Sequence, residues 1–347
     1  MNSDEGDWSA DYLASSSLRA LVPLASRFMS LARYVVLLSS FLLVTACGDA
    51  GADAKSGKSR IVVIPKGTTH VFWQAVQSGA QEAAANTDLD MMFKGPLSEN
   101  DRAAQKQLVQ QFIGEGVAGI ALAPLDGKAL VPEVKRAKAK GIPVVIFDSA
   151  LEGTVGEDFA SFVATDNGAS GELAGVEMAR LLGNKGKVVV LRYQVGSAST
   201  TEREEGFLKA ARAAGLEILV DNRHAGASIG EAKTAALNMA DDLKNAAGVF
   251  CPCEPVTNGM MLALDQLGIA GKLKFVGFDV TKPLKDGLSN GKIHALVVQN
   301  PRRMGQLAVE HLGRLIAGES VEKEVDTGCV LATKANMNQP DIAALLK

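Results

Sequence analysis

From Arg60 onward the chain alternates short apolar runs with longer amphipathic stretches. The runs lack the strict alternation of a half-exposed strand, which indicates strands that are buried on both faces. The stretches between them have helical spacing, as the crossover connections of parallel strands require. The pattern therefore predicts an α/β fold in which helices cover both faces of parallel sheets. The expected strands are 61–64, 119–122, 144–147, 188–191, 248–250, 275–278 and 295–298, and the expected helices are 72–85, 101–114, 129–140, 171–182, 202–214, 229–243, 258–267 and 304–316.

One strand pattern occurs twice, once in each half of the chain. Residues 144–148 and 275–279 are both apolar runs that end in Phe-Asp. A chain of 347 residues is also longer than one hydrophobic core usually organises. Both observations predict two lobes of similar architecture.

Hydrogen-bonding side chains follow most of the expected strands. In an open parallel sheet, ligands bind beyond the carboxyl ends of the strands, where such side chains gather. Each residue alone is also consistent with a cap or a turn, and Asp148 and Asp279 in particular could cap the segments that follow them. Together they predict a polar cleft between the two lobes. These strand-end residues are Lys66, Asp126, Asp148, Ser149, Arg192, Tyr193, Gln194, Cys253, Glu254, Asp279 and Gln299.

Lys66, Phe72 and Trp73 each allow two interpretations. A Schiff-base lysine needs a desolvated amine and a carbonyl substrate, so we predict an ion pair or a hydrogen bond to a ligand for Lys66. Phe72 and Trp73 open an expected helix, where they either pack under the sheet or lie at the cleft mouth. Aromatic rings at a cleft pack on the apolar face of a sugar while polar groups bind its hydroxyls. We expect at least one of the two rings to line the cleft.

The motifs of enzymes and metal sites are absent or misplaced. Gly114-x-Gly116-x-x-Gly119 matches a dinucleotide fingerprint in letters, but it follows a helix and precedes a strand, the reverse of the required order. Cys251 and Cys253 lack the further ligands of a zinc site, so we expect free thiols with one turned to the cleft. No set of nucleophile, base and orienting residue is recognisable. We therefore expect no enzymatic activity, no cofactor and no metal.

The N-terminal segment has the features of a bacterial export signal. Arg33 precedes an apolar run over 34–44, whose 11 residues are too few to span a bilayer core that needs about 20. The run ends in Val-Thr-Ala-Cys at Cys47, a lipobox in which the cysteine is acylated and becomes the first mature residue. Acidic residues before Met29 indicate that translation starts at this methionine. We expect residues 1–47 to be a signal peptide and the protein to be anchored by Cys47 in the periplasm or at the cell surface.

Residues 48–59 are rich in Gly, Ala, Ser and Asp and predict a flexible tether.

The charge balance argues against nucleic-acid partners, because the chain has 36 Lys and Arg against 39 Asp and Glu, a net charge of −3. A sugar-responsive transcription regulator would need a DNA-binding helix-turn-helix before Arg60. The sequence has the export signal there instead.

With these features together, the chain resembles the ribose-binding-protein family of periplasmic sugar receptors for ABC importers, over residues 60–333. The order and spacing of several motifs make the resemblance specific. The motifs are Ser78-Gly79-Ala80-Gln81, the run from Gly141 to Asp148, Ala164-Thr165-Asp166-Asn167, the run from Thr201 to Phe207, Val276-Gly277-Phe278-Asp279 and Val298-Gln299-Asn300-Pro301.

The resemblance implies a set of ligand-binding residues and four departures from the family pattern. Carboxylates that accept two hydrogen bonds and a forked arginine suit the neighbouring hydroxyls of a sugar. Ser149 and Cys253 replace the family's arginine and asparagine, and Lys66 and His70 replace a serine and an asparagine, which argues against ribose itself. The predicted ligand-binding residues are Lys66, His70, Phe72, Trp73, Asp148, Ser149, Arg203, Cys253, Glu254, Asp279 and Gln299.

The resemblance also implies the type I periplasmic binding protein fold, with two similar doubly wound parallel-sheet lobes joined by a three-segment hinge. The chain is then expected to cross between the lobes near Asp166, Gln299 and Asp326. The expected N-terminal lobe is 60–166 plus 300–326, and the expected C-terminal lobe is 167–299 plus 327–347.

The implied function is that of a monomeric solute receptor. It closes on a small sugar or polyol and presents it to an ABC permease and its ATPase, with both lobes in contact with the ligand. Ile64-Pro65-Lys66, Lys94-Gly95-Pro96 and Asp148-Ser149 also resemble the receptor for the furanosyl signal autoinducer-2 and the rhamnose receptors. Those ligands, and a sugar chemoreceptor without a transport role, are the alternatives.

Overall fold

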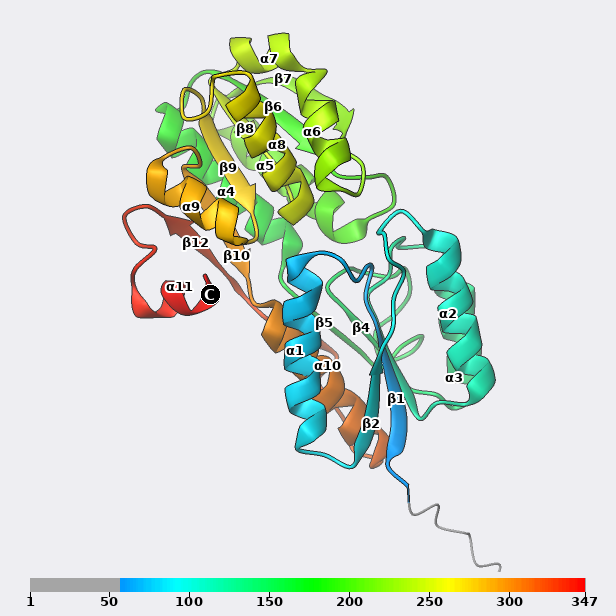
Figure 1. Cartoon of the computed structure of the whole chain (residues 1–347). Coiled ribbons are helices and arrows are strands. Elements are labelled where there is room, and N and C mark those ends of the chain that lie inside the picture. The colour runs from blue at the N-terminus through cyan, green and yellow to red at the C-terminus, as the bar shows by residue number, and fades with distance from the viewer. Residues whose placement is uncertain (1–56, 347) are drawn as a thin grey trace, which may run out of the picture. The chain divides into compact units, whose positions relative to one another are not determined.

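The structure is a computed structural model that describes residues 57–346. Cys47, the signal peptide and nearly all of the expected tether lie outside the described residues. The described part belongs to one compact unit, Ser56–Lys347, and contains two sheets (Figure 1). Within residues 57–346, no helix is both long enough and apolar enough to cross a bilayer.

The first lobe is built on a six-stranded, wholly parallel sheet in the order β11-β5-β4-β3-β1-β2. Helices α1 and α10 cover one face and helices α2 and α3 cover the other, so both faces are buried (Figure 1). The strands are β1 (Ser59–Ile64), β2 (Leu89–Phe93), β3 (Gly119–Leu122), β4 (Val144–Phe147), β5 (Ser161–Ala164) and β11 (Glu324–Asp326). The helices are α1 (Val71–Ala85), α2 (Arg102–Glu115), α3 (Val131–Ala139) and α10 (Pro301–Ile316).

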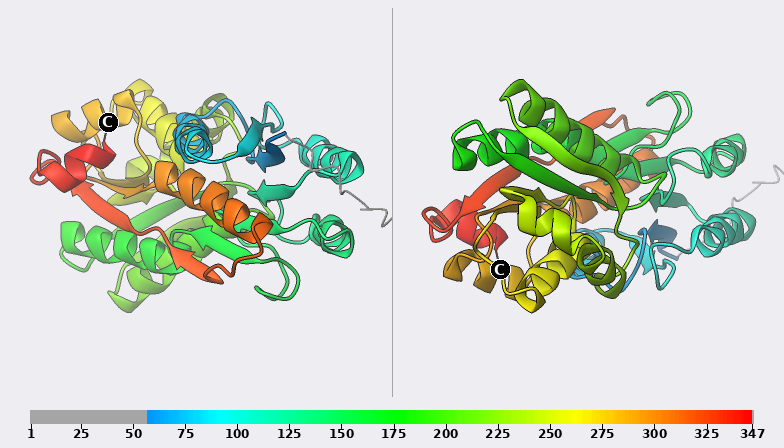
Figure 2. Two further views of the ribbon diagram at one scale, coloured as in Figure 1. Left: turned by 90° about the horizontal axis from the view of Figure 1, so that it is seen from below. Right: turned by 90° about the horizontal axis from the view of Figure 1, so that it is seen from above.

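The second lobe repeats this plan with the strand order β12-β10-β9-β8-β6-β7. Only its edge strand β12 runs antiparallel to its neighbour, and helices again lie on both sides of the sheet (Figure 2). The strands are β6 (Lys187–Arg192), β7 (Glu217–His224), β8 (Gly248–Phe250), β9 (Lys274–Phe278), β10 (Ala295–Gln299) and β12 (Cys329–Thr333). The helices are α4 (Asn167–Leu182), α5 (Ala198–Ala213), α6 (Ile229–Leu237), α7 (Ala240–Asn245), α8 (Glu254–Gln266), α9 (Lys282–Asn290) and α11 (Pro340–Leu345).

The chain passes from one sheet to the other three times. It leaves the first sheet after β5, returns to the first lobe after β10, and leaves again between β11 and β12. Gln299 is the last residue of β10, so it lies where the chain leaves the second sheet. The expected α/β fold with two parallel-sheet lobes is confirmed.

A close helix pair supports each sheet on one side. A side chain at Gly79 of α1 would lie 1.9 Å from the carbonyl oxygen of Arg302 in α10, and one at Gly305 would lie 2.0 Å from that of Val76. In the second lobe, a side chain at Gly171 of α4 would lie 2.1 Å from the carbonyl oxygen of Arg203 in α5. Glycine is therefore required at these positions because the two backbones touch.

All seven expected strands are present, but the sequence interpretation missed five others. Four of these, β2, β7, β11 and β12, lie at sheet edges and are partly exposed. The expected helix 229–243 is wrong as a single helix, because it breaks at Asn238 and Met239 into α6 and α7. Helices α9 and α11 were also missed.

Candidate functional site

Asp148 and Asp279 occupy equivalent places, one in each lobe. Each follows a strand that ends in Phe, and each has a left-handed backbone, with φ of 62° and 65°. The amide of Asp148 donates to the carbonyl oxygen of Val163 at 3.0 Å, and that of Asp279 donates to Val297 at 2.9 Å. Both backbones are therefore held by the neighbouring strand, and both side chains lie at the carboxyl edge of their sheet.

Neither aspartate caps the segment that follows it. Thr281, not Asp279, is the N-cap of α9, and a strand rather than a helix follows Asp148. Asp279 Oδ2 instead accepts the amide of Glu254, the first residue of α8, at 2.9 Å. The capping interpretation of these two residues is wrong.

A cavity lies between the two sheet edges. Ten of the eleven predicted ligand-binding residues line it, and they come from both lobes. The lining residues are Lys66, His70, Phe72, Trp73, Glu99, Asp148, Tyr193, Ser199, Thr200, Arg203, Cys253, Glu254, Pro255, Asp279 and Gln299.

Lys66 has a partner for each proton of its ammonium group. Its Nζ lies 3.1 Å from Asp148 Oδ2 within the first lobe. It also donates to the hydroxyls of Ser199 at 2.8 Å and Ser197 at 3.3 Å in the second lobe. The lysine is thus an ion-pair and hydrogen-bond donor that joins the two lobes.

Glu99 gathers three donors around one buried carboxylate. Oε1 lies 2.5 Å from Nδ1 of His70 and accepts from Nε1 of Trp73 at 2.7 Å. Oε2 accepts from the hydroxyl of Tyr193, in the other lobe, at 2.9 Å. Burial raises the pKa of Glu99, but His70 and the other partners outweigh it and leave the pKa below its ordinary value.

His70 is the counterpart of this carboxylate. Burial lowers the pKa of His70, but its hydrogen bond to Glu99 and the charge of Glu99 outweigh burial and leave the pKa raised. The pair is therefore a buried ion pair in the first lobe, next to the second lobe's Tyr193.

Arg203 and Gln299 form a second hydrogen-bond network in the cavity lining. Arg203 donates to Asn167 Oδ1 at 2.8 Å, to the carbonyl oxygen of Pro252 at 3.0 Å and to Gln299 Oε1 at 2.7 Å. Gln299 in turn donates to Asp279 Oδ1 at 2.7 Å. Burial raises the pKa of Asp279, although Arg203 and these donors oppose the shift.

Glu254 reaches from the second lobe to the N-terminus of α1 in the first. Its carboxylate accepts the backbone N–H of Phe72 at 2.8 Å and that of Val71 at 3.3 Å. His70, the N-cap residue of α1, makes no side-chain cap of its own, so Glu254 satisfies amides that the helix leaves open. Burial raises the pKa of Glu254 to about 7, against the lowering effect of these N–H groups and His70.

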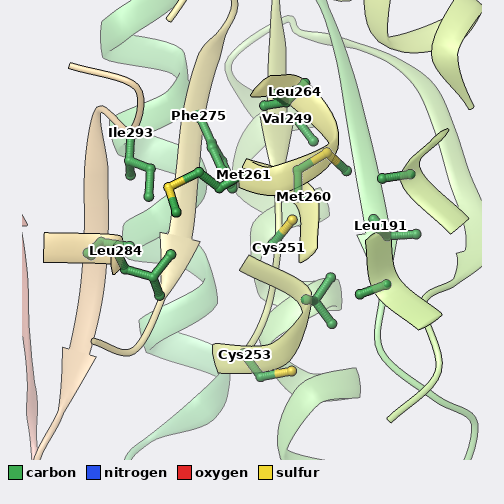
Figure 3. Close-up of a cluster of buried hydrophobic side chains, with 14 of the residues drawn as sticks. Leu191, Val249, Cys251, Cys253, Met260, Met261, Leu264, Phe275, Leu284 and Ile293 are labelled. Carbon is green, nitrogen blue, oxygen red and sulfur yellow. The ribbon is translucent and has the colours of Figure 1, made fainter. Parts of the chain in front are cut away.

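The aromatic and sulfur side chains form the apolar part of the lining. Phe72 and Trp73 meet edge to face with ring centroids 4.9 Å apart, and Trp73 also packs on Phe147 in the core. Both rings line the cavity. Cys251 is buried in the second lobe's core, while Cys253 lies at the end of the same cluster and lines the cavity (Figure 3). Both thiols are free, as expected.

Ser149 is the predicted residue that does not line the cavity. Its side chain is fully buried, and its hydroxyl accepts the amide of Ser199 at 3.1 Å. It therefore joins the two lobes beside the cavity. The sequence interpretation in turn omitted the lining residues Glu99, Ser199, Thr200 and Pro255, and it named Tyr193 only as one of the strand-end residues of the cleft.

Among residues 57–346, no group of three or more His, Cys, Asp or Glu side chains is placed to hold a metal ion. The cavity instead combines carboxylates, an arginine, an amide and aromatic faces from two lobes. Such a lining suits an uncharged molecule with several hydroxyl groups.

Residues 61–320 match the family described as the periplasmic binding protein domain. The chain belongs to this family. As a family member, it is a binding protein of sugar importers rather than an enzyme, and its place is outside the cytoplasm.

Curated and solved proteins of this family are similar over nearly their whole length. The D-ribose/D-allose-binding protein of Pseudomonas aeruginosa is 28% identical over 87% of this chain and 95% of its own. An ABC transporter solute-binding protein of Agrobacterium vitis, solved with bound D-fucose, is 36% identical with a TM-score of 0.80, covering 83% of this chain and 100% of its own. A carbohydrate transporter solute-binding protein of Agrobacterium radiobacter, solved with D-arabinose, is 30% identical with a TM-score of 0.79, covering 84% and 100%.

Proposed function

We propose that this chain is the lipid-anchored receptor of an ABC sugar importer and binds one neutral monosaccharide between its lobes. The single observation that carries the proposal is the pair of strand-end aspartates, Asp148 and Asp279, which face one cavity from two lobes. Each lies where a parallel sheet presents its ligand-binding edge. Carboxylates from both lobes suit a molecule whose hydroxyl groups contact both lobes.

The pairing of charges favours a neutral ligand over a carboxylate or phosphate. All three protons of Lys66 have partners, and His70 is paired with Glu99. A negatively charged ligand would have to break one of these buried pairs. Asp148 Oδ1, by contrast, has no partner among the described residues, and Arg203 retains two N–H groups after its three bonds. These groups are available to hydroxyls.

The relatives support the same ligand class. Their names and bound molecules are ribose, allose, D-fucose and D-arabinose, all neutral sugars of five or six carbons.

Ligand-driven closure is the proposed working motion. Contacts across the cavity, such as Lys66 to Ser199 and Glu254 to Phe72, exist only when the lobes meet. Small-angle scattering is expected to give a smaller radius of gyration with saturating sugar than without it. An unchanged radius would contradict closure.

Anchoring by Cys47 belongs to the same proposal. The lipobox before Cys47 predicts cleavage and acylation at this residue, so globomycin or Cys47→Ala should block processing. A mature chain that begins at another residue would contradict the anchor but not the sugar site.

The ligand itself can be identified directly. Protein purified without refolding is denatured, and the released small molecules are analysed by mass spectrometry, followed by calorimetric titration of the candidates. We expect a neutral monosaccharide. Recovery of a furanosyl signal molecule would favour the autoinducer-2 alternative, and turnover of a bound sugar would contradict a binding role.

A further inference from the structure

One connecting segment of the second lobe lies along the first lobe. This segment, which we call the strap, comprises residues 193–199 and leads from the end of β6 into the first turn of α5. Every residue of the strap except Ala198 hydrogen-bonds to the first lobe. The bonds are Tyr193 Oη to Glu99 Oε2 at 2.9 Å, Gln194 Nε2 to the carbonyl oxygen of Glu99 at 2.9 Å, the Arg102 guanidinium to the carbonyl oxygen of Val195, the Gly127 amide to the carbonyl oxygen of Gly196 at 3.1 Å, Lys66 Nζ to the hydroxyls of Ser197 at 3.3 Å and Ser199 at 2.8 Å, and the Ser199 amide to Ser149 Oγ at 3.1 Å.

The middle of the strap contacts the first lobe outside the sugar cavity. Within the described residues 57–346, the cavity lining includes Tyr193 and Ser199 at the two ends of the strap but none of residues 194–197. Arg102 and Gly127, which donate to carbonyl oxygens of the strap, do not line the cavity either. These bonds therefore form between protein groups alone and need no sugar.

The strap fits closely against the first lobe at Gly196. Its φ of 93° is one that glycine adopts readily. A side chain here would lie 2.5 Å from Asp126 Oδ2 and 2.9 Å from Arg102 Nη2. Asp126 also lies 3.6 Å from Arg102 Nε, so it holds the guanidinium group beside the carbonyl oxygen of Val195. The backbone of one lobe thus packs directly on side chains of the other.

Contacts of this kind favour the closed form with or without a ligand. The apparent affinity of a ligand that requires the closed form scales with the fraction of protein that is already closed. Bonds that raise this fraction therefore strengthen the binding of every sugar by the same factor. Residues that touch the sugar act differently, because they distinguish one sugar from another.

We propose that the strap is a sugar-independent latch. It keeps part of the protein closed before a sugar arrives, and it sets the strength of sugar binding while the cavity sets the selectivity. The inference rests on the proposed function and deepens it, because it separates the residues that set affinity from those that select the sugar.

Two substitutions in one chain weaken the latch without changing the cavity lining. Arg102→Met and Gln194→Met each remove a donor between the lobes and keep a side chain of similar length. Both residues are at least partly exposed, so the fold should persist, and melting temperatures of the sugar-free variants check this. Lys128→Met is the matched control. Lys128 lies in the same surface groove as Gln194, but its partner Glu152, at 2.9 Å, belongs to its own lobe.

Two measurements on the full exported chain report the latch. Calorimetric titration with D-ribose, D-allose, D-fucose and D-arabinose gives the sugar affinities. Hydrogen exchange of the Gly127 amide, followed by NMR in protein refolded free of sugar, gives the closed fraction, because this amide is bonded only while the lobes meet. The Lys128 amide is the internal reference, since it donates to Asp126 Oδ1 at 2.9 Å within one lobe.

The double variant is expected to bind every sugar more weakly by one common factor and to exchange the Gly127 amide faster. Multiplied together, the two factors give the loss of latch strength, which we expect to be about 10-fold or more for two lost hydrogen bonds. The Lys128 amide and the Lys128→Met variant should behave as in the wild-type chain.

Three results separate the latch from the proposed function. Wild-type sugar affinities together with wild-type exchange at Gly127 in the double variant would overturn the latch. A changed ratio between the affinities of two sugars would overturn it as well, since the strap would then select the sugar. If none of the four sugars binds to the wild-type chain, the proposed function fails, and the exchange rate of Gly127 alone decides whether the latch exists.

Discussion

The carboxyl group of Glu254 should make sugar binding weaken as the pH rises. In the structure this group is buried against the N-terminus of α1 in the other lobe, and burial raises its pKa to about 7. When the lobes separate, the same group becomes solvated and returns to its ordinary pKa of 4.5. Glu254 therefore binds its proton more tightly when the lobes are in contact than when they are separated. Closure, and with it sugar affinity, is favoured below pH 4.5 and loses this advantage as the pH rises through 7.

The size of the effect follows from the two pKa values. A shift of the Glu254 pKa from 4.5 to about 7 corresponds to about 3 kcal/mol. This is the difference in the free energy of closure between a fully protonated and a fully ionised Glu254. Between pH 5.5 and pH 8, the proton linkage weakens sugar binding by roughly 10- to 30-fold. Burial also raises the pKa of Asp279, which faces Glu254. The raised pKa of His70 is due chiefly to Glu99, which opposes the lowering effect of burial and lies in the same lobe, so that interaction does not depend on closure.

Three variants isolate the contribution of this one carboxyl group. Glu254→Gln keeps an oxygen for the Phe72 amide but cannot ionise, so most of the pH dependence should disappear. Glu254→Ala leaves the α1 amides uncapped, so binding should be weaker at every pH by an amount that corresponds to about 1 kcal/mol. Glu204→Gln is the control, because Glu204 also has a pKa of about 7 but its partners, Arg192 and the amide of Tyr193, lie in its own lobe.

The assay is calorimetric titration of the identified sugar at four pH values between 5.5 and 8, in buffers of matched ionic strength. The wild-type chain and Glu204→Gln should share one steep profile, and Glu254→Gln should give a nearly flat one. If Glu254→Gln keeps the wild-type slope, the proton is bound elsewhere and the assignment to Glu254 is refuted.

Asp148→Gly and Asp279→Gly should each weaken sugar binding by about 10- to 100-fold, since each removes charge-assisted hydrogen bonds while glycine adopts the same positive φ without strain. If calorimetry shows that both variants bind the sugar as tightly as wild type, the sugar does not bind in this cavity. Glu99→Gln should lower the pKa of His70, because the charge of Glu99 is what raises it; an imidazole titration followed by NMR that matches wild type would contradict the buried ion pair. Gly79→Ala should destabilise the first lobe by about 1–3 kcal/mol or more, because the new methyl group meets the carbonyl oxygen of Arg302; denaturant unfolding with an unchanged midpoint would disprove this close contact.

The central strands could be predicted because they are buried on both faces. The runs at β1, β3, β4, β6, β8, β9 and β10 are continuously apolar, a pattern that needs no knowledge of their neighbours. Edge strands lack that pattern. β7 is half exposed and ends in Asp221, Asn222, Arg223 and His224, so its strand character comes from pairing with β6 rather than from its own composition.

The same reasoning explains which site residues were found. Lys66, Asp148, Asp279 and Gln299 follow or end buried strands, and the edge of a parallel sheet brings such residues together. Glu99 follows no buried strand and lies in the loop after an edge strand, so a single acidic residue there has no sequence signal. Ser199 and Thr200 lie in the first turn of α5 and reach the cavity only because that helix begins at the sheet edge.

The left-handed backbone at Asp148 and Asp279 also limits how this receptor can change its ligand during evolution. With φ values of 62° and 65°, these two positions favour Asp, Asn or Gly, because a larger or β-branched side chain would strain the chain. A single substitution there can exchange a carboxylate for an amide or remove the group, but it cannot install a hydrophobic or cationic contact at little cost. New specificities must therefore arise at neighbours with ordinary backbones, such as Cys253 or His70, while the two anchors stay fixed.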